Sequence, residues 1–227
     1  MSEMPRNYSI VSIEGNIGSG KSTLLNNLRA YYENNTEVIF LKEPVDEWNN
    51  IQDQNGVSIL EKFYADQHKY SFPFQMMAYI SRLKILNDAL ENIKGSNKRH
   101  IIITERCLYT DKNVFAKMLY DQGKIEDVCY QIYLKWFDEF CKNLHIDHFV
   151  YVRTFADECY ERIHKRSRKG EEVIPLSYLE DCHSYHDEYV MNFESSTNVI
   201  ELDGNVDIYE NPDTIEKWIK YIDSIVA

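Results

Sequence analysis

The glycine-rich stretch "GNIGSGKS", residues 15–22, constrains the fold more than any other part of the chain. It follows an apolar run at 8–13, opens a helical pattern at 21–33 and fits G-x-x-x-x-G-K-[ST] in full. In this context the glycines allow a tight turn whose amide N–H groups point inward at phosphate oxygens. The positive end of the helix dipole adds to the attraction. The stretch therefore predicts a phosphate-binding loop for a nucleotide such as ATP, but it does not specify the reaction.

Two side chains of this loop carry distinct expected roles. Lys21 can reach the β- and γ-phosphates, and the Ser22 hydroxyl can ligate Mg²⁺. We expect nucleotide contacts along the whole loop: Gly15, Asn16, Ile17, Gly18, Ser19, Gly20, Lys21, Ser22 and Thr23.

The rest of the chain alternates between two patterns. Short apolar runs rich in β-branched residues occur at 8–13, 37–41, 100–104, 148–152 and 198–202. Stretches of helical period occupy 21–33, 72–93, 112–121, 126–144, 156–166, 176–193 and 211–226, and turn-rich loops lie at 49–56 and 94–98. This alternation predicts an α/β, P-loop-type three-layer fold with a five-stranded parallel sheet flanked by helices. Because no repeat or linker interrupts it, we expect one domain over residues 1–227.

Composition excludes some classes of partner. The formal net charge of −12 argues against a nucleic-acid polymer, which usually needs an extensive basic surface. No segment approaches ~18 uninterrupted apolar residues, so we expect no membrane partner. The five cysteines are odd in number and contain no C-x-x-C pair. This pattern is typical of reduced thiols and predicts a cytoplasmic protein.

Acidic side chains follow two of the predicted strands. Glu43 comes after the run at 37–41, and the following proline biases it toward extended backbone. The carboxyl ends of parallel strands form the ligand edge of such sheets, so Glu43 can accept the proton of a hydroxyl that attacks a γ-phosphate. Its other interpretation is an ordinary solvated loop acid.

The run at 100–104 delivers Glu105 and Arg106 to the same edge. An acid in this position of a P-loop protein usually holds Mg²⁺, directly or through water. Arg106 can hold Glu43 or a substrate oxygen in place. The alternative is a surface ion pair.

Positive charge concentrates in "YERIHKRSRKGEE", 160–172. On a helix, Arg162, Arg166 and Lys169 share a face, and Arg168 lies at the end of the segment. A basic helical run is often only a solvated face. In an acidic P-loop protein we expect it to be a lid over about 162–172 that supplies arginines to the transition state.

Six motifs in order resemble one family: "IEGNIGSGKST", "EPVDEW", "PFQ", "ERCLYTD", "YVRT" and "YERIHKRSRKGEEVIPLSYLEDCH". They are similar to the deoxynucleoside kinases of the deoxycytidine, deoxyguanosine and mitochondrial-type thymidine kinase group. The resemblance implies transfer of the γ-phosphoryl group of ATP, with Mg²⁺, to the 5′-hydroxyl of a deoxynucleoside in nucleotide salvage. It also implies roles for single residues: Glu43 as catalytic base, Arg106 as its partner, Arg166 and Arg168 as lid arginines, and Arg162 against the donor's base.

The same resemblance implies an acceptor pocket. Gln75 matches a glutamine that reads the nucleobase edge, which a carboxamide can do with one donor and one acceptor. Tyr64 and Glu171 match the pair that holds the deoxyribose 3′-hydroxyl. Three aromatic residues are expected as apolar walls, with core packing as the alternative: Trp48, Phe63 and Phe115. The chain departs from the family pattern at Gly170, where a glutamate is common.

Arg82 and Asp111 bear on base specificity. They match the deoxycytidine and deoxyguanosine kinase pattern, in which an Arg–Asp pair lies beside the base. A buried ion pair is costly, so it is better explained by recognition than by stability. With Ala78 leaving room for a larger ring, we expect deoxyadenosine, deoxycytidine or deoxyguanosine to be favoured over thymidine. The alternative is that the two side chains pair with other neighbours.

Several interpretations stay open. Aromatic residues on more than one face of "YQIYLKWFDEF", 130–140, are typical of either a homodimer interface or core packing: Tyr133, Trp136, Phe137 and Phe140. Cys182, His183, His186 and Asp187 suggest a metal cluster, but structural roles are favoured. The alternative functions are a thymidylate-type nucleoside monophosphate kinase and a non-catalytic P-loop ATP-binding module.

Overall fold

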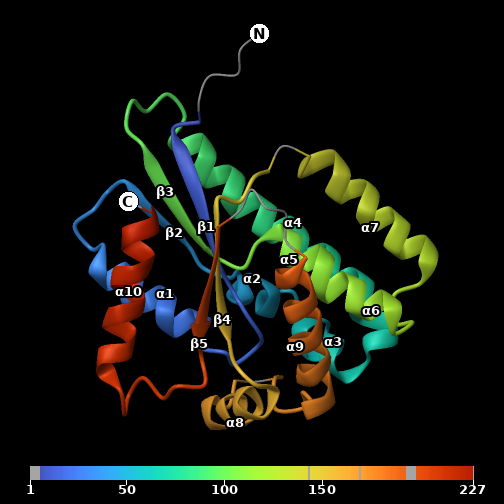
Figure 1. Cartoon of the computed structure of the whole chain (residues 1–227). Coiled ribbons are helices and arrows are strands. Elements are labelled where there is room, and N and C mark those ends of the chain that lie inside the picture. Colours follow the sequence, from blue (N-terminus) through green and yellow to red (C-terminus); the bar gives the residue numbers. More distant parts are fainter. Residues whose placement is uncertain (1–5, 143, 169, 193–197, 227) are drawn as a thin grey trace.

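The computed structural model describes residues 6–142, 144–168, 170–192 and 198–226. Its strands are β1 (Tyr8–Glu14), β2 (Val38–Leu41), β3 (His100–Glu105), β4 (His148–Arg153) and β5 (Asn198–Asp203). They form one parallel sheet in the order β2-β3-β1-β4-β5, as Figure 1 shows. The predicted α/β fold and all five predicted strands are confirmed.

Helices connect the strands. They are α1 (Lys21–Tyr31), α2 (Val45–Asn50), α3 (Ile59–Ala65), α4 (Gln67–Asn92), α5 (Leu108–Thr110), the π-helix η1 (Asp111–Ala116), α6 (Lys117–Asp121), α7 (Asp127–Phe140), α8 (Ala156–Arg166), α9 (Leu176–Met191) and α10 (Pro212–Val226). In the π-helix each turn holds an extra residue compared with an α-helix, and such turns are frequent at functional sites.

Alternate residues of the strands point to opposite faces of the sheet. Val11 and Ile13 of β1 pack with leucines of α1 and with isoleucines of α10. Ile10 points the other way and packs with Tyr79 of α4 and Phe137 of α7. The two helical layers therefore lie on opposite sides of the sheet, α1 and α10 on one and α4 and α7 on the other (Figure 1).

The helices before β3 differ from the sequence prediction. α4 begins at Gln67, five residues before the predicted start at 72, because the Asp66 side chain caps it by accepting from the Lys69 amide at 3.2 Å. Pro73 is therefore inside the helix. The sequence analysis also missed α2 and α3. Ser58 and Glu61 form a capping box that starts α3, a signal that is visible in the sequence.

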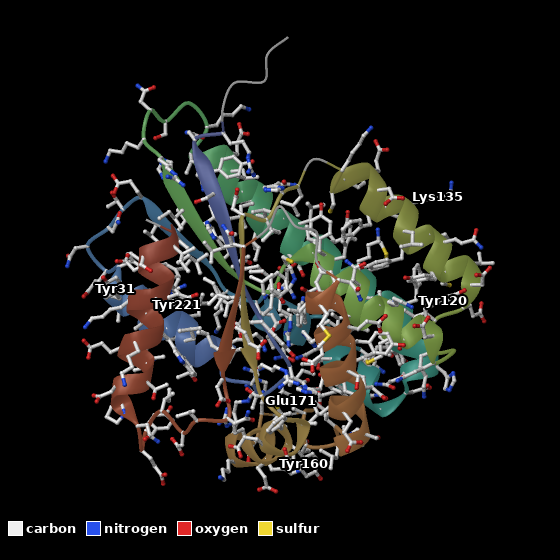
Figure 2. The ribbon with its side chains drawn as sticks, in the orientation of Figure 1. Tyr31, Tyr120, Lys135, Tyr160, Glu171 and Tyr221 are labelled. Atoms are coloured by element: carbon white, nitrogen blue, oxygen red, sulfur yellow. The ribbon has the colours of Figure 1, made fainter. Side chains whose placement is uncertain are left out.

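The carboxyl ends of the strands meet on one edge of the sheet, where α8 also lies (Figure 1). Glu171, between α8 and α9, is only 4% exposed and lies beside this edge, whereas Tyr31 and Tyr221 reach solvent from α1 and α10 (Figure 2). This edge is where open α/β sheets bind ligands. In the described part of the chain, no helix has the length and apolar character needed to cross a membrane.

Candidate functional site

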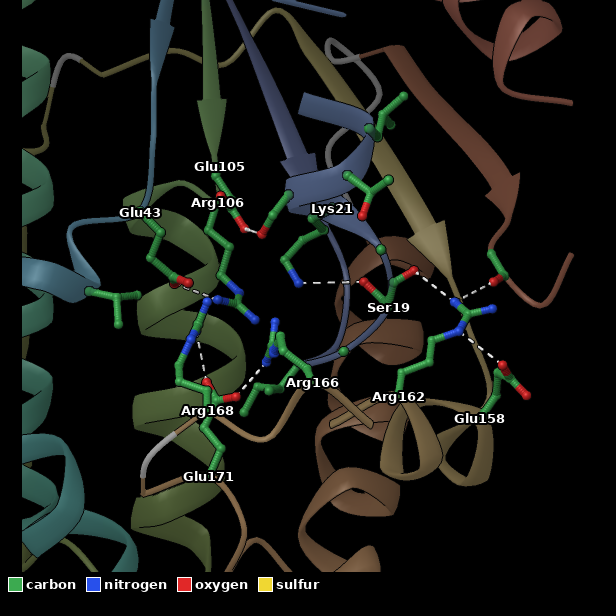
Figure 3. Close-up of a pocket in the computed structure, with 18 of the residues that line it drawn as sticks. Ser19, Lys21, Glu43, Glu105, Arg106, Glu158, Arg162, Arg166, Arg168 and Glu171 are labelled. Atoms are coloured by element: carbon green, nitrogen blue, oxygen red, sulfur yellow. Dashed lines mark hydrogen bonds and ion pairs between the residues drawn. The ribbon is translucent and has the colours of Figure 1, made fainter. Parts of the chain in front are cut away.

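A cavity of about 510 Å³ lies at the carboxyl edge of the sheet and joins the phosphate loop to α2, α3, α4 and the lid (Figure 3). Of the predicted site residues, these line it: Ile17, Gly18, Ser19, Gly20, Lys21, Ser22, Thr23, Glu43, Trp48, Phe63, Tyr64, Gln75, Ala78, Arg82, Glu105, Arg106, Asp111, Phe115, Arg162, Arg166, Arg168 and Glu171. Only Gly15 and Asn16 do not. The predicted residues come from at least six separate elements, and the fold brings them to one cavity.

Gly15 and Asn16 lie at the base of the loop and not on its open side. Gly15 has φ +142°, and a Cβ there would be 2.5 Å from the Val152 carbonyl oxygen, so the position requires glycine. Asn16 Nδ2 donates to the Leu179 carbonyl at 2.8 Å, and Asn16 Oδ1 accepts from the Ile17 amide at 2.8 Å. Gly15 therefore lets the loop pass close to β4, and Asn16 connects the loop to α9.

Lys21 lies across the mouth of the loop (Figure 3). Its Nζ donates to the Asn16 carbonyl at 2.5 Å and to Ser19 Oγ at 3.4 Å. Burial and the positive charge of Arg106 lower the pKa of Lys21 to about 7. An anion in the loop would raise this pKa again and keep the Lys21 side chain protonated, which is the behaviour expected of a phosphate-binding lysine.

Ser22 and Glu105 supply oxygen atoms side by side. The Ser22 hydroxyl donates to Glu105 Oε1 at 2.6 Å, and Glu105 is 3% exposed. A hydroxyl and a carboxylate are the ligands that Mg²⁺ prefers, and the loop beside them would bring phosphate oxygens. These two residues fit an Mg²⁺ ion as the sequence analysis expects.

Glu43 lies between two arginines. Arg106 Nη1 forms a short ion pair with Glu43 Oε1, and Arg82 Nη2 approaches the same oxygen at 3.1 Å. Burial raises the pKa of Glu43, but Arg106, Arg82 and Lys21 outweigh it and lower the pKa to about 2. Glu43 is therefore ionised throughout the physiological range.

Arg82 connects this carboxylate to the expected base-recognition residue. Its Nε donates to Asp111 Oδ2 at 2.8 Å, and its Nη1 donates to the Glu105 carbonyl at 2.7 Å. Both side chains of the Arg82–Asp111 pair are 4% exposed. Burial lowers the pKa of Arg82, but Asp111 and Glu43 raise it by more, so Arg82 stays charged. Asp111 is the first residue of the π-helix η1, which also carries Phe115.

The inner end of the cavity is largely aromatic. Phe63 stacks on Phe74 with ring centroids 4.5 Å apart, and Trp48 meets Phe74 edge-on at 5.4 Å. Phe115 lies under Arg106, whose Cζ is 4.9 Å from the ring centroid. Among these rings Gln75 is 3% exposed, and its Oε1 atom has no hydrogen-bond partner. A buried amide oxygen without a partner is costly, and a ligand that donates to it would remove that cost.

The lid arginines make two kinds of contact. Arg162 Nη1 donates to the Gly204 carbonyl at 2.8 Å, and its Nε pairs with Glu158 at 2.9 Å (Figure 3). Arg166 and Arg168 both pair with Glu171, and Arg168 Nη1 lies 2.9 Å from Glu171 Oε1. Arg166 and Arg168 were expected to be lid arginines and Glu171 a sugar-binding residue, but the pairing of both arginines with this one carboxylate was not foreseen. Lys169 lies outside the described residues.

The departure at Gly170 has a steric explanation. Gly170 has φ +88°, and a Cβ at this position would be 2.9 Å from Glu61 Cγ. A glutamate here would be strained and would collide with α3. Gly170 therefore allows the lid to pack closely against this helix.

Sequence reasoning missed several residues of the cavity. Phe74 and Tyr178 line the inner end, and Tyr209 lines the cavity together with Gly204. For Phe74, the neighbouring Gln75 was an available signal. Tyr209 is 83% exposed and gives no pattern that a sequence could reveal.

The expected structural roles of the cysteine and histidine group agree with its contacts. Asp187 pairs with Arg153 at 2.6 Å and accepts from the Tyr151 hydroxyl at 2.7 Å. His186 Nδ1 lies 2.6 Å from the Cys182 carbonyl oxygen. Within the described ranges, no three histidine, cysteine or acidic side chains are grouped so as to hold a metal ion by themselves.

Comparison with known proteins identifies the family. Residues 11–227 match the family described as "Deoxynucleoside kinase". A probable deoxycytidine kinase of fowlpox virus (strain NVSL) is 35% identical over 207 residues, covering 88% of this chain and 81% of the relative. Deoxycytidine kinase of Bos taurus is 31% identical, covering 92% and 89%, and mitochondrial deoxyguanosine kinase of Xenopus laevis is 31% identical, covering 87% and 81%. The chain belongs to the deoxynucleoside kinase family and is an enzyme, a phosphotransferase.

Proposed function

We propose that this enzyme transfers the γ-phosphoryl group of ATP to the 5′-hydroxyl of a 2′-deoxynucleoside, with deoxyadenosine, deoxycytidine or deoxyguanosine favoured over thymidine. The observation that carries the proposal is the continuity of the cavity. It runs from Lys21 in the phosphate loop, past Glu43, to Gln75 and Asp111. A nucleoside with its base at Gln75 would direct its 5′-end toward Glu43 and the phosphate loop.

Glu43 is the proposed acceptor for the hydroxyl proton. With a pKa near 2 it is too weak a base to ionise an alcohol in advance. Phosphoryl transfer, however, proceeds through a loose transition state in which the alcohol becomes acidic as the new P–O bond forms. An ionised carboxylate in hydrogen-bond reach is then sufficient to take the proton. Arg106 would orient it.

The phosphate side is assigned to the loop and the lid. Lys21 would contact the β- and γ-phosphates, and Ser22 and Glu105 would hold the Mg²⁺ ion, which neutralises charge on the phosphates when bound. Arg166 and Arg168 would stabilise the charge of the transferring group. Because both now pair with Glu171, phosphates and Glu171 would compete for them.

Base selection is assigned to three residues. Gln75 offers an unpaired acceptor at Oε1, and the Arg82–Asp111 pair adds one charged partner of each sign. Deoxyadenosine, deoxycytidine and deoxyguanosine carry an exocyclic amino group that can donate to a carboxylate, whereas thymidine carries a methyl group that cannot. Ala78 leaves space for a purine ring.

A phosphoryl-transfer assay tests the proposal. Purified enzyme is given radiolabelled ATP, Mg²⁺ and each of the four deoxynucleosides, and kcat/KM is compared. The expected result is efficient transfer to at least one of the three favoured acceptors and loss of transfer in Glu43→Gln. Thymidine as the best acceptor would refute the specificity, and full activity of Glu43→Gln would refute the role of the base.

The thymidylate-type alternative predicts a different ligand. A monophosphate kinase must bind the acceptor's phosphate, whereas the carboxylate of Glu171 and the hydroxyl of Tyr64, both on the cavity wall, suit an uncharged sugar better. Thermal stabilisation by deoxycytidine or deoxyadenosine, but not by the corresponding monophosphates, supports the nucleoside kinase. The reverse pattern would support the alternative.

We also propose that the enzyme is a homodimer that forms through α7. Tyr133 and Phe137 of this helix are buried, but four other side chains, four residues apart, are 41–65% exposed: Val128, Ile132, Trp136 and Phe140. The resemblance to the family supports a second copy as the partner that covers them. Light scattering should give the mass of a dimer, and Trp136→Glu should give a monomer that still binds ATP. A monomeric wild type would refute this.

For the compartment, we propose the reducing cytoplasm. All five cysteines are free in the structure. Disulfide-free cysteines are typical of proteins in reducing compartments. Localisation of a tagged full-length chain in its host cell tests this, and an organelle signal would refute it.

A further inference from the structure

Arg106 has an unusual backbone for its residue type. Its φ is +61°, in the left-handed region that non-glycine residues rarely adopt. Such a conformation persists only where the surrounding structure enforces it, and it is enriched at active sites. Figure 3 shows its guanidinium directed at Glu43. The direction of the side chain therefore depends on whatever holds the Arg106 backbone.

Besides the bond from Arg82 to the Glu105 carbonyl, three hydrogen bonds hold this turn, and β1 supplies the acceptors of two of them. The Arg106 amide donates to the Ile13 carbonyl at 3.0 Å, which continues the pairing of β3 with β1. The next amide, of Cys107, donates to Glu14 Oε1 at 2.9 Å. The carbonyl of the same Arg106–Cys107 peptide accepts from Thr104 Oγ1 at 2.8 Å. Each backbone group next to the strained torsion thus has a fixed partner.

Glu14 is unusual among these partners. It is 0% exposed, and its Oε1 also accepts from Ser12 Oγ at 2.5 Å, while its Oε2 has no hydrogen-bond partner. Burying a carboxyl group is expensive, and burial raises the pKa of Glu14 against the opposing effects of its hydrogen bonds and Arg106. The cavity does not account for this side chain, because Glu14 does not line it.

The position of Glu14 explains why it is there. It is the last residue of β1 and directly precedes Gly15, whose carbonyl lies 3.4 Å from Arg106 Nη2. Arg106 is therefore held at both ends by adjacent residues, its backbone turn by Glu14 and its guanidinium by Gly15. Both contacts connect it to the strand that leads into the phosphate loop.

We propose that Glu14 is a positioning residue, which fixes the left-handed turn at Arg106 and so aims its guanidinium at Glu43. The inference rests on the proposed roles of Glu43 and Arg106. Removing the acceptor at Glu14 lets the turn relax toward ordinary backbone angles and moves the guanidinium away from Glu43. Thr104 supports the same turn from the β3 side.

Two variants of Glu14 separate positioning from charge. Glu14→Gln keeps an oxygen that accepts from the Cys107 amide, whereas Glu14→Leu has similar size and no acceptor. In the transfer assay, Glu14→Leu should lower kcat about 10- to 100-fold, the usual cost of misplacing a catalytic group by about 1 Å, with each KM within about threefold of wild type. Because Glu43 loses Arg106, the acid limb of kcat/KM should also move to higher pH. Glu14→Gln should stay near wild type on both measures.

Controls make the outcomes decisive. Ile200→Ala, in β5 at the far edge of the sheet, removes a buried side chain away from this turn and should keep kcat. The proposal is overturned if Glu14→Leu keeps its kcat, if Glu14→Gln falls as far, or if Ile200→Ala loses kcat equally. If Glu14→Leu does not fold, Thr104→Val decides, and an unchanged kcat there overturns it. A wild type without activity, or an active Glu43→Gln, would instead refute the proposed function.

Discussion

Removing the Arg82–Asp111 pair should change which base the enzyme prefers. In the double variant Arg82→Met with Asp111→Ala both charges disappear together, so no unpaired charge stays buried. Arg82 Nε lies 2.8 Å from Asp111 Oδ2, both side chains are 4% exposed, and both line the cavity. Replacing it creates an apolar space beside Gln75 where a thymine methyl group can lie.

The size of the effect follows from two contributions. A base with an amino group loses a hydrogen bond to a charged partner, worth about 1.5–3 kcal/mol. Thymidine gains burial of one methyl group, about 0.8 kcal/mol. The sum of about 2–4 kcal/mol corresponds to a change of roughly 30- to 1,000-fold in the ratio of kcat/KM for thymidine to that for the best of the other three.

Competition kinetics with all four deoxynucleosides measure this ratio directly. A matched control is Lys84→Met with Asp88→Ala, which removes an exposed ion pair of 2.6 Å from the same helix α4. The control should leave the ratio unchanged. A double variant whose ratio stays within about threefold of wild type, well below the expected range, would refute the assignment of base selection to Arg82 and Asp111.

Other predictions concern the charges and the lid. In the same double variant Glu43 loses the Arg82 guanidinium at 3.1 Å, so the pKa of Glu43 should rise. The acid limb of the pH–kcat/KM profile should then move to higher pH by about one to two units, and an unmoved limb would contradict this. Phosphate binding should raise the pKa of Lys21 from about 7, so ATP binding at pH 8 should be accompanied by uptake of up to roughly 0.9 proton. Calorimetry in buffers of different ionisation enthalpy measures this uptake, and Lys21→Met should abolish it. Gly170→Ala should lower the unfolding free energy by ~1–2 kcal/mol because of its φ of +88°, and the contact of the new Cβ with Glu61 should lower it further. Gly95→Ala, with φ +80° and no neighbour within 4 Å, should lower it by the backbone contribution alone. Equal losses of Tm in the two glycine variants would show that the contact with Glu61 has no effect.

Much of the fold could be predicted because local patterns carried it. The apolar runs that became β1 to β5 are rich in β-branched residues, and a parallel sheet buries such runs on both faces. The last helical stretch was predicted over 211–226, and α10 begins at Pro212, one residue later. α4 was misjudged at its start, which was predicted at 72, whereas the cap at Asp66 lies six residues earlier.

The candidate site could be predicted as a set of residues but not as a network. The phosphate-loop motif and the family resemblance named 22 of the 36 described residues that line the cavity, because motifs preserve residue types at fixed spacing. The contact of Arg82 with Glu43 as well as with Asp111 joins distant motifs and was not predictable. The pairing of Glu171 with two arginines depends on how the turn after α8 packs, and it was not predictable either. Such contacts depend on how elements pack, which one sequence does not encode in any local pattern.

The π-helix has a consequence for how this enzyme can evolve. η1 holds one more residue per turn than an α-helix, and it begins at Asp111 and includes Phe115. Loss of a single codon within 112–114 would let the segment close as an α-helix, in which three steps of about 100° turn the chain nearly as far as four steps of the wider π-helix. Asp111 would then keep nearly the same direction relative to Phe115. One in-frame deletion can thus remove the extra residue and keep the acceptor pocket, whereas the same deletion in an ordinary α-helix would rotate the two residues apart by about 100°.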